Sequence, residues 1–123
     1  MWQPRYKQYI AETAVGANLI VKPGSTDDYQ VQSAAATDYL IGVSGNVAGA
    51  AGERVDVIRE GIADVVFGGA VTRGAPLTSD ANGKAVVAAP SAGSNVRIIG
   101  FAEVSGVSGD IGSVYLSPGV MQG

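Results

Sequence analysis

Carboxylates are the only side chains numerous enough to do acid–base chemistry in this 123-residue chain, which has eleven acidic residues but no histidine or cysteine. Nucleophilic machinery built on Ser–His or Cys–His pairs is therefore excluded, and so are thiolate metal sites. The one adjacent acidic pair, Asp27-Asp28, follows a Pro23-Gly24 turn. Paired carboxylates are typical of hydrolases and calcium sites, but neighbouring strand residues point to opposite faces and Asp favours turns. We interpret the pair as a solvated turn.

Two further segments resemble binding motifs without completing one. Asp80-Ala81-Asn82-Gly83 lacks the later oxygen ligands and terminal glutamate of a calcium loop, and its Asn-Gly step predicts a β-hairpin turn. The glycines at 106, 109 and 112 do not have dinucleotide-binding spacing and precede no helix, so they predict a strand connection. We expect no cofactor, no metal site and no enzymatic activity; a carboxylate-based hydrolase is the third-ranked alternative.

The N-terminal eight residues differ from the rest of the chain, because they combine cations and aromatic rings without an acid. Trp, Tyr and Arg dominate protein-interface hot spots. We predict that residues 1–8 form an extended arm that docks on a neighbouring subunit or partner. The predicted contact residues are Trp2, Pro4, Arg5, Tyr6, Lys7 and the adjoining Tyr9. A frayed terminus is the alternative; single-stranded nucleic acid is a weaker one, because two cations supply little affinity.

The elements that would carry these residues are β-strands. Seventeen Val and eight Ile against four Leu favour a pleated surface, while eighteen Gly and five Pro interrupt any long helix. Residues 9–123 are predicted to form one small all-β domain, a β-barrel or β-sandwich. The expected strands are Tyr9–Ala14, Leu19–Lys22, Tyr29–Ser33, Leu40–Val43, Val55–Arg59, Ile62–Phe67, Ala85–Ala88, Arg97–Val104 and Ser113–Leu116. Ser33–Tyr39 is expected to be a loop or a single helical turn, because seven residues cannot sustain a helix.

A faint internal echo runs through the chain. Thr26-Asp27, Val31, Ala34-Ala35 and Ile41-Gly42-Val43 are followed in the same order by Ser79-Asp80, Val86, Ala88-Ala89 and Ile99-Gly100-Phe101. One hypothesis is two similar β-modules packed pseudo-symmetrically. Coincidence in an Ala-, Val- and Gly-rich chain explains the echo equally well.

Charge and hydropathy limit the partners. A net charge of −3 opposes binding to nucleic acid. No apolar run approaches the ~20 residues of a membrane helix, and the N-terminus lacks the apolar core of a secretory signal. We expect a soluble protein with no nucleic-acid or membrane partner.

An ordered series of glycines and valines resembles a known family. The series runs through Ile41-Gly42-Val43, Gly52–Gly61, Gly68–Leu77, Asp80–Ala85, Ile99–Ala102, Gly109 and Val114–Leu116. It is similar to the capsid decoration (cement) proteins of tailed bacteriophages, over about Tyr9 to Leu116. The resemblance implies a structural protein on the exterior of the virion capsid, bound to the major capsid protein and to itself as a homo-oligomer, a trimer rather than a dimer. The alternative is a β-rich adhesion, receptor-binding, fibre or baseplate module of a virion.

Overall fold

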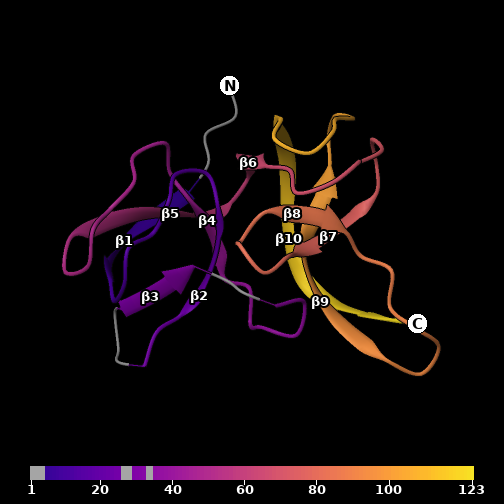
Figure 1. The fold of residues 1–123 in the computed structure, drawn as a ribbon, viewed down its shortest axis with the longest axis horizontal. Coiled ribbons are helices and arrows are strands. Elements are labelled where there is room, and N and C mark those ends of the chain that lie inside the picture. The colour runs from indigo at the N-terminus through magenta and orange to yellow at the C-terminus, as the bar shows by residue number, and fades with distance from the viewer. Residues whose placement is uncertain (1–4, 26–28, 33–34) are drawn as a thin grey trace.

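A computed structural model describes residues 5–25, 29–32 and 35–123, and within these ranges the protein is built from strands with no helix. The predicted all-β class is confirmed. The ten strands are β1 (Arg5–Ala11), β2 (Ile20–Pro23), β3 (Tyr29–Gln32), β4 (Gly42–Ser44), β5 (Arg54–Glu60), β6 (Ile62–Val66), β7 (Pro76–Ser79), β8 (Ala85–Val87), β9 (Asn95–Ala102) and β10 (Ile111–Gln122). Figure 1 shows β1–β5 gathered on one side and β7–β10 on the other, with β6 between them.

The first half of the protein, β1 to β5, is a closed barrel with strand order β1-β3-β2-β4-β5. Its closure comes from the parallel pairing of β1 with β3, where Ile10 lies opposite Tyr29 and Ala11 opposite Gln30. Alternate residues of each strand point inward. The barrel interior is filled by Tyr9, Ala11, Val15, Val21, Ile41, Val55 and Val57.

The second half, β6 to β10, forms a five-stranded sheet with order β6-β10-β9-β7-β8. Its two edge strands, β6 and β8, approach each other through a single parallel bridge between Phe67 and Ala85. We call the place where β1 meets β3 the seam of the first half, and the place where β6 meets β8 the seam of the second half. The seam is paired in the first half and nearly open in the second.

Apart from the seam, strand pairing is the same in both halves, so the echo in the sequence has a structural basis. Strands β1–β5 correspond in order to β6–β10. Val21 pairs with Gly42 in the first half, and Leu77 pairs with Gly100 in the second. The residues Ile41-Gly42-Val43 therefore correspond to Ile99-Gly100-Phe101, as the echo predicts; Thr26-Asp27 and Ala34 lie outside the described residues.

The halves are not packed symmetrically, which corrects the pseudo-symmetric hypothesis. The segment Asn18–Ile20 of the first half lies across the open seam of the second. Val66 N donates to Asn18 O (2.9 Å), and Ile20 N donates to Gly83 O (2.7 Å). Asn18 Nδ2 adds a hydrogen bond to Asp64 O at 3.1 Å. One hydrophobic cluster joins Ile20, Leu40 and Val43 to the interior of the second half, so each half depends on the other for burial.

Most strand ends differ from the predicted ones by one to three residues, and three differences are larger. β1 begins at Arg5 rather than Tyr9, because residues 5–8 pair with β5. β7 (Pro76–Ser79) was not predicted, since a proline before two hydroxyl residues does not resemble a strand; proline is tolerated there because it is the first residue of the strand. β10 extends to Gln122, where Met121 and Gln122 pair with β9.

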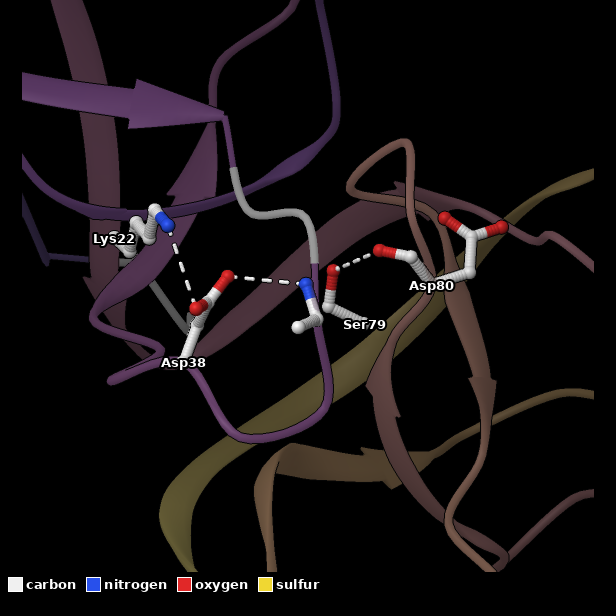
Figure 2. A network of polar contacts seen from close by, with 5 residues as sticks. Lys22, Asp38, Ser79 and Asp80 are labelled. Atoms are coloured by element: carbon white, nitrogen blue, oxygen red, sulfur yellow. Dashed lines mark hydrogen bonds and ion pairs between the residues drawn. The ribbon is translucent and has the colours of Figure 1, made fainter.

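The predicted hairpin at Asp80–Gly83 is present, joining β7 to β8. Gly83 has a positive φ of 75°, whereas Asn82 does not, so only the glycine uses the left-handed region. Asp80 Oδ1 accepts hydrogen bonds from Asn82 N (2.8 Å) and Lys84 N (2.9 Å). Figure 2 shows Ser79 Oγ donating to Asp80 O, at 2.9 Å.

The predicted loop Ser33–Tyr39 is described from Ala35 onward and contains a turn at residues 36–38. Asp38 holds this turn by accepting from Lys22 Nζ (3.3 Å) and from Ala35 N (3.0 Å), as Figure 2 shows. Arg97 N of β9 donates to Ala36 O at 2.8 Å. The loop therefore links β2 of the first half to β9 of the second.

Candidate interaction surface

The predicted contact residues that the structure describes lie on β1. Arg5, Tyr6 and Lys7 are exposed members of this strand and pair with Glu60, Ile58 and Val57 of β5. These residues therefore belong to the barrel sheet instead of extending away from it. Trp2 and Pro4 lie outside the described residues.

Tyr9 points into the barrel, where only 8% of its surface is exposed. Its hydroxyl accepts a hydrogen bond from Arg59 Nη1 at 2.7 Å, and Arg59 Nε donates to Ile41 O at 3.1 Å. Lys7 Nζ lies 5.0 Å from the centroid of the Tyr9 ring, within cation–π range. Tyr9 is thus the residue that anchors β1 in the barrel.

Tyr6 is the most prominent aromatic side chain on the described part of β1, with 63% of its surface exposed. It lines two shallow depressions, one on each side. The first, of about 340 Å³, is shared with Ile58 and Asp64 and lies where the halves meet. The second, of about 290 Å³, is shared with Arg5 and Glu60. An exposed ring between two depressions is a suitable anchor for a protein partner.

The charges around Tyr6 are solvent-exposed. Arg5 Nε lies 3.6 Å from Glu60 Oε2, but both side chains are more than half exposed, so this ion pair contributes little to stability. Lys7 and Arg59 line the same depression as Arg5. Cations gathered on an otherwise acidic protein can attract and orient an acidic partner surface.

The carboxylates do not form a catalytic or metal-binding group in the part of the chain that the structure describes. The pair Asp27-Asp28 lies outside the described residues, and no set of three acidic side chains gathers among the others. Glu12 has a turn-bracing role instead: hydrogen bonds from the Ser25 hydroxyl (2.5 Å) and the Ser25 backbone N–H (2.8 Å) lower the pKa of this carboxyl. The described residues also contain no helix that could span a membrane.

A second surface, which was not predicted from the sequence, lies on the outside of the second half. Four residues form a line across neighbouring strands, which we call the outer row. In the second half the outer row consists of Ile62, Tyr115, Phe101 and Pro76. In the first half the residues at the same register positions are Tyr6, Ile58, Val43 and Ile20. Apolar residues on these strands are visible in the sequence, but which of them are exposed depends on the tertiary packing.

Comparison with known proteins agrees with this architecture. A family model described as phage cement protein matches residues 7–120. No curated protein matches the chain. The fold is similar to that of the crystal structure of the head fiber gp8.5 N base in bacteriophage phi29, with a TM-score of 0.69 and 19% identity over 94% of this chain and 95% of that one. The family match spans both halves and all ten strands, and the chain belongs to the phage cement protein family.

Proposed function

We propose that this protein decorates the outer surface of a phage head and stabilises the lattice of the major capsid protein, with no enzymatic activity. The observation that carries the proposal is the cement-family match over residues 7–120. Exterior placement, after synthesis in the host cytoplasm, and a homo-oligomer, a trimer rather than a dimer, are the finer parts of the proposal. They follow from the residue pattern that resembles decoration proteins.

The fold is well suited to a brace. Ten strands tie the chain together in two hydrogen-bonded sheets, and a shared hydrophobic cluster joins the halves. A brace needs rigid β-structure and repeated copies more than it needs titratable groups. When many copies bind an ordered lattice, modest individual interfaces reinforce one another.

The exposed part of β1 is the surface we propose for the capsid. Tyr6 supplies an aromatic anchor, while Arg5 and Lys7 supply charge beside it. Tyr9 holds the strand in place from inside the barrel. Trp2 and Pro4 remain part of the proposed contact on the basis of their residue types.

A fibre component of the virion is the second candidate function. It is favoured by the likeness in fold to the head fiber N base. A decoration protein and a fibre base both attach to a head, but a fibre base would also carry a further structure outward. An adhesion or receptor-binding module would instead bind cells or glycans.

The test is co-sedimentation of the purified protein with heads built from the major capsid protein of the same phage. We expect the wild type to sediment with heads and the Tyr6→Ala variant to bind them at least about tenfold more weakly, as for an interface anchor worth over 1.4 kcal/mol. Val87→Ala, a change at an exposed residue of β8, is the matched control and should bind normally. Binding to cells or glycans without binding to heads would contradict the proposal.

Deleting residues 1–7 would test the contact, but it would also remove Arg5, Tyr6 and Lys7 from the β1 pairing with β5. Point substitution separates the two effects. The triple variant Arg5→Ala, Tyr6→Ala, Lys7→Ala keeps the β1 backbone and should unfold at nearly the wild-type temperature while losing head binding.

A further inference from the structure

At three of the four outer-row positions the side chain is more buried in the first half than in the second, although the strand register is the same; the fourth first-half residue, Tyr6, is exposed. In the first half Ile20 and Val43 are fully buried, and Ile58 packs partly buried against the same cluster. In the second half Phe101 is 38% exposed and Tyr115 is 47% exposed. Ile20 and Val43 of the first half are thus covered by other residues, whereas Phe101 and Tyr115 at the corresponding positions of the second half are exposed.

The partner of the first-half outer row is the second half of the same chain. Ile20 and Val43 belong to one hydrophobic cluster with Val65 and Phe67 of the second half, and the backbone of Asn18–Ile20 bonds to Val66 of β6 and to Gly83 in the hairpin turn before β8. Within the chain, the outer row of the first half therefore packs against the seam of the second half. Among the residues that the structure describes, no corresponding seam packs on the outer row of the second half.

The surroundings of the exposed outer row strengthen this comparison. Ten large hydrophobic residues are exposed among those described, and five of them come from the stretch that begins with β9 residue Phe101 and ends with β10 residue Tyr115. The five are Phe101, Val104, Val107, Ile111 and Tyr115. Concentrations of exposed apolar side chains mark interaction sites on soluble proteins. Asp64 and Glu103 are exposed beside these residues and give the surface an acidic edge.

We propose that the exposed outer row of the second half binds the first-half seam of a second copy of this chain, so that copies associate head to tail. The first-half seam presents Ile10 and Tyr29, which are half-buried on its outside, and Arg54 pairs with Ile10 there. The Arg54 guanidinium complements the acidic edge formed by Asp64 and Glu103. This inference deepens the proposed function, because it assigns the surface through which copies associate.

The two surfaces of this contact are different, which limits the assemblies that it can make. Such a contact closes into a ring when its rotation returns to the first copy, and otherwise continues as a filament. The inference therefore predicts a closed ring, such as a trimer, or a filament, and excludes a two-fold dimer in which one outer row faces another.

Sedimentation equilibrium of the isolated protein provides the first test. We expect Tyr115→Lys to weaken self-association by about thirtyfold or more, as for a hot-spot residue. Val120→Lys is the matched control, since Val120 is 58% exposed on the same strand but beyond the outer row. Thermal unfolding of both variants checks that they are folded. Unchanged self-association of Tyr115→Lys would overturn the inference.

Disulfide trapping provides the second test, which is clean because the chain has no native cysteine. A Tyr115→Cys chain mixed with a Tyr29→Cys chain should give a mixed disulfide dimer on oxidation, while neither chain alone should cross-link efficiently. Efficient self-linking of Tyr115→Cys would overturn the head-to-tail arrangement.

Head binding is measured separately, so that failure of the inference and failure of the proposed function can be told apart. A wild type that stays monomeric, combined with loss of head binding by Tyr115→Lys, would overturn the second copy as the occupant and assign the outer row to the capsid. Mixed disulfide formation without any head binding would support the inference and contradict the proposed function.

Discussion

The two halves share one strand topology, but the large side chains that fill their interiors come from different strands. In the first half Ala11 of β1 lies near Gln30 and Val55, whereas the corresponding residues of the second half are Phe67, Ala85 and Gly112. A small residue and a large one have exchanged places between neighbouring strands. The glycines beside these residues show how tightly the large side chains are packed.

A Cβ atom on Gly112 would collide with the Phe67 ring, and one on Gly106 would lie 2.8 Å from the same ring. In the first half Gly49 stands at the position of Gly106, and its Cβ would collide with Val55 instead. In each half a glycine thus leaves room for a large neighbouring side chain, Phe67 in the second half and Val55 in the first. The comparison teaches that corresponding interior space can be filled by a side chain from a different strand in each half.

The carboxylate that braces the β2–β3 or β7–β8 connection shows the same exchange. In the first half Glu12 supplies it, and Gly24 leaves it room, since a Cβ there would be 3.0 Å from Glu12 Oε1. In the second half the bracing carboxylate is that of Asp80, which accepts a hydrogen bond from Lys84 N. A Cβ atom on Gly68 would collide with this carboxylate. The acid follows β1 and the glycine follows β2 in the first half, whereas in the second half the glycine follows β6 and the acid follows β7.

The largest expected effect comes from removing the ring that fills the second half. Phe67 is fully buried, so Phe67→Ala should lower the free energy of unfolding by about 3–5 kcal/mol. Urea denaturation measures this loss. Phe101→Ala, which truncates an aromatic residue 38% exposed in the same half, is the control and should cost much less. A loss under about 1 kcal/mol for Phe67→Ala would show that the second half can collapse around the gap.

The next effect tests the exchange itself by giving the second half the residues of the first. Gly112→Val alone should destabilise by about 1–3 kcal/mol because its side chain meets the Phe67 ring. In a Phe67→Ala background the same change should be neutral or stabilising, which gives a coupling energy of about 1–3 kcal/mol. Gly69→Val is the control, since its Cβ approaches only Val86, at 3.9 Å. Additive effects of the Phe67 and Gly112 changes would refute compensation.

A smaller effect is expected at the left-handed turn after β1 and β6. Asn18 (φ 58°) in the first half corresponds to Gly74 (φ 89°) in the second. Gly74→Ala should cost about 1–2 kcal/mol and Gly74→Asn less, because Asn tolerates this conformation better than Ala. Thermal unfolding compares the two variants, with Gly69→Ala as a control at a glycine of ordinary φ. Equal losses for Ala and Asn would contradict this account.

The smallest effect is a pH dependence confined to the first half. Hydrogen bonds from Ser25 hold the pKa of Glu12 below its usual value of 4.5. A carboxyl with a lowered pKa in the folded state adds stability above its unfolded pKa, and this stability is lost as pH falls through the folded pKa. The unfolding temperature of wild type should therefore exceed that of Glu12→Gln at pH 7, and the difference should shrink below pH 4.5. A difference that persists at acid pH would contradict the assignment.

Local chemistry made most of the fold predictable. Alternating valines identified β5, a short apolar run identified β6, and the Asn82-Gly83 step identified the β7–β8 hairpin. Strand β7 was missed because Pro76 and the hydroxyl residues Thr78 and Ser79 owe their strand conformation to neighbours on both sides.

The candidate site was less predictable than the fold. Residue types singled out Arg5, Tyr6 and Lys7 as unusual, but their pairing with β5 is a long-range contact that no local pattern reveals. Tyr9 is buried because its side chain points into the first-half barrel, whereas Tyr115 lies on the outside of the second half, and both placements depend on the tertiary fold. The capsid contact of β1 stays a prediction.

The position of Asn18–Ile20 across the open seam has a consequence for how the chain folds as it is synthesised. The first half pairs β1 with β3 using its own strands, so its barrel can close while the rest is still on the ribosome, and Ile20 and Val43 stay uncovered until the second half packs against them. The second half needs Asn18–Ile20 from the first to cover its seam. The second half should therefore fold against the first half after the first half has formed. A chain that begins at β6 should not fold alone.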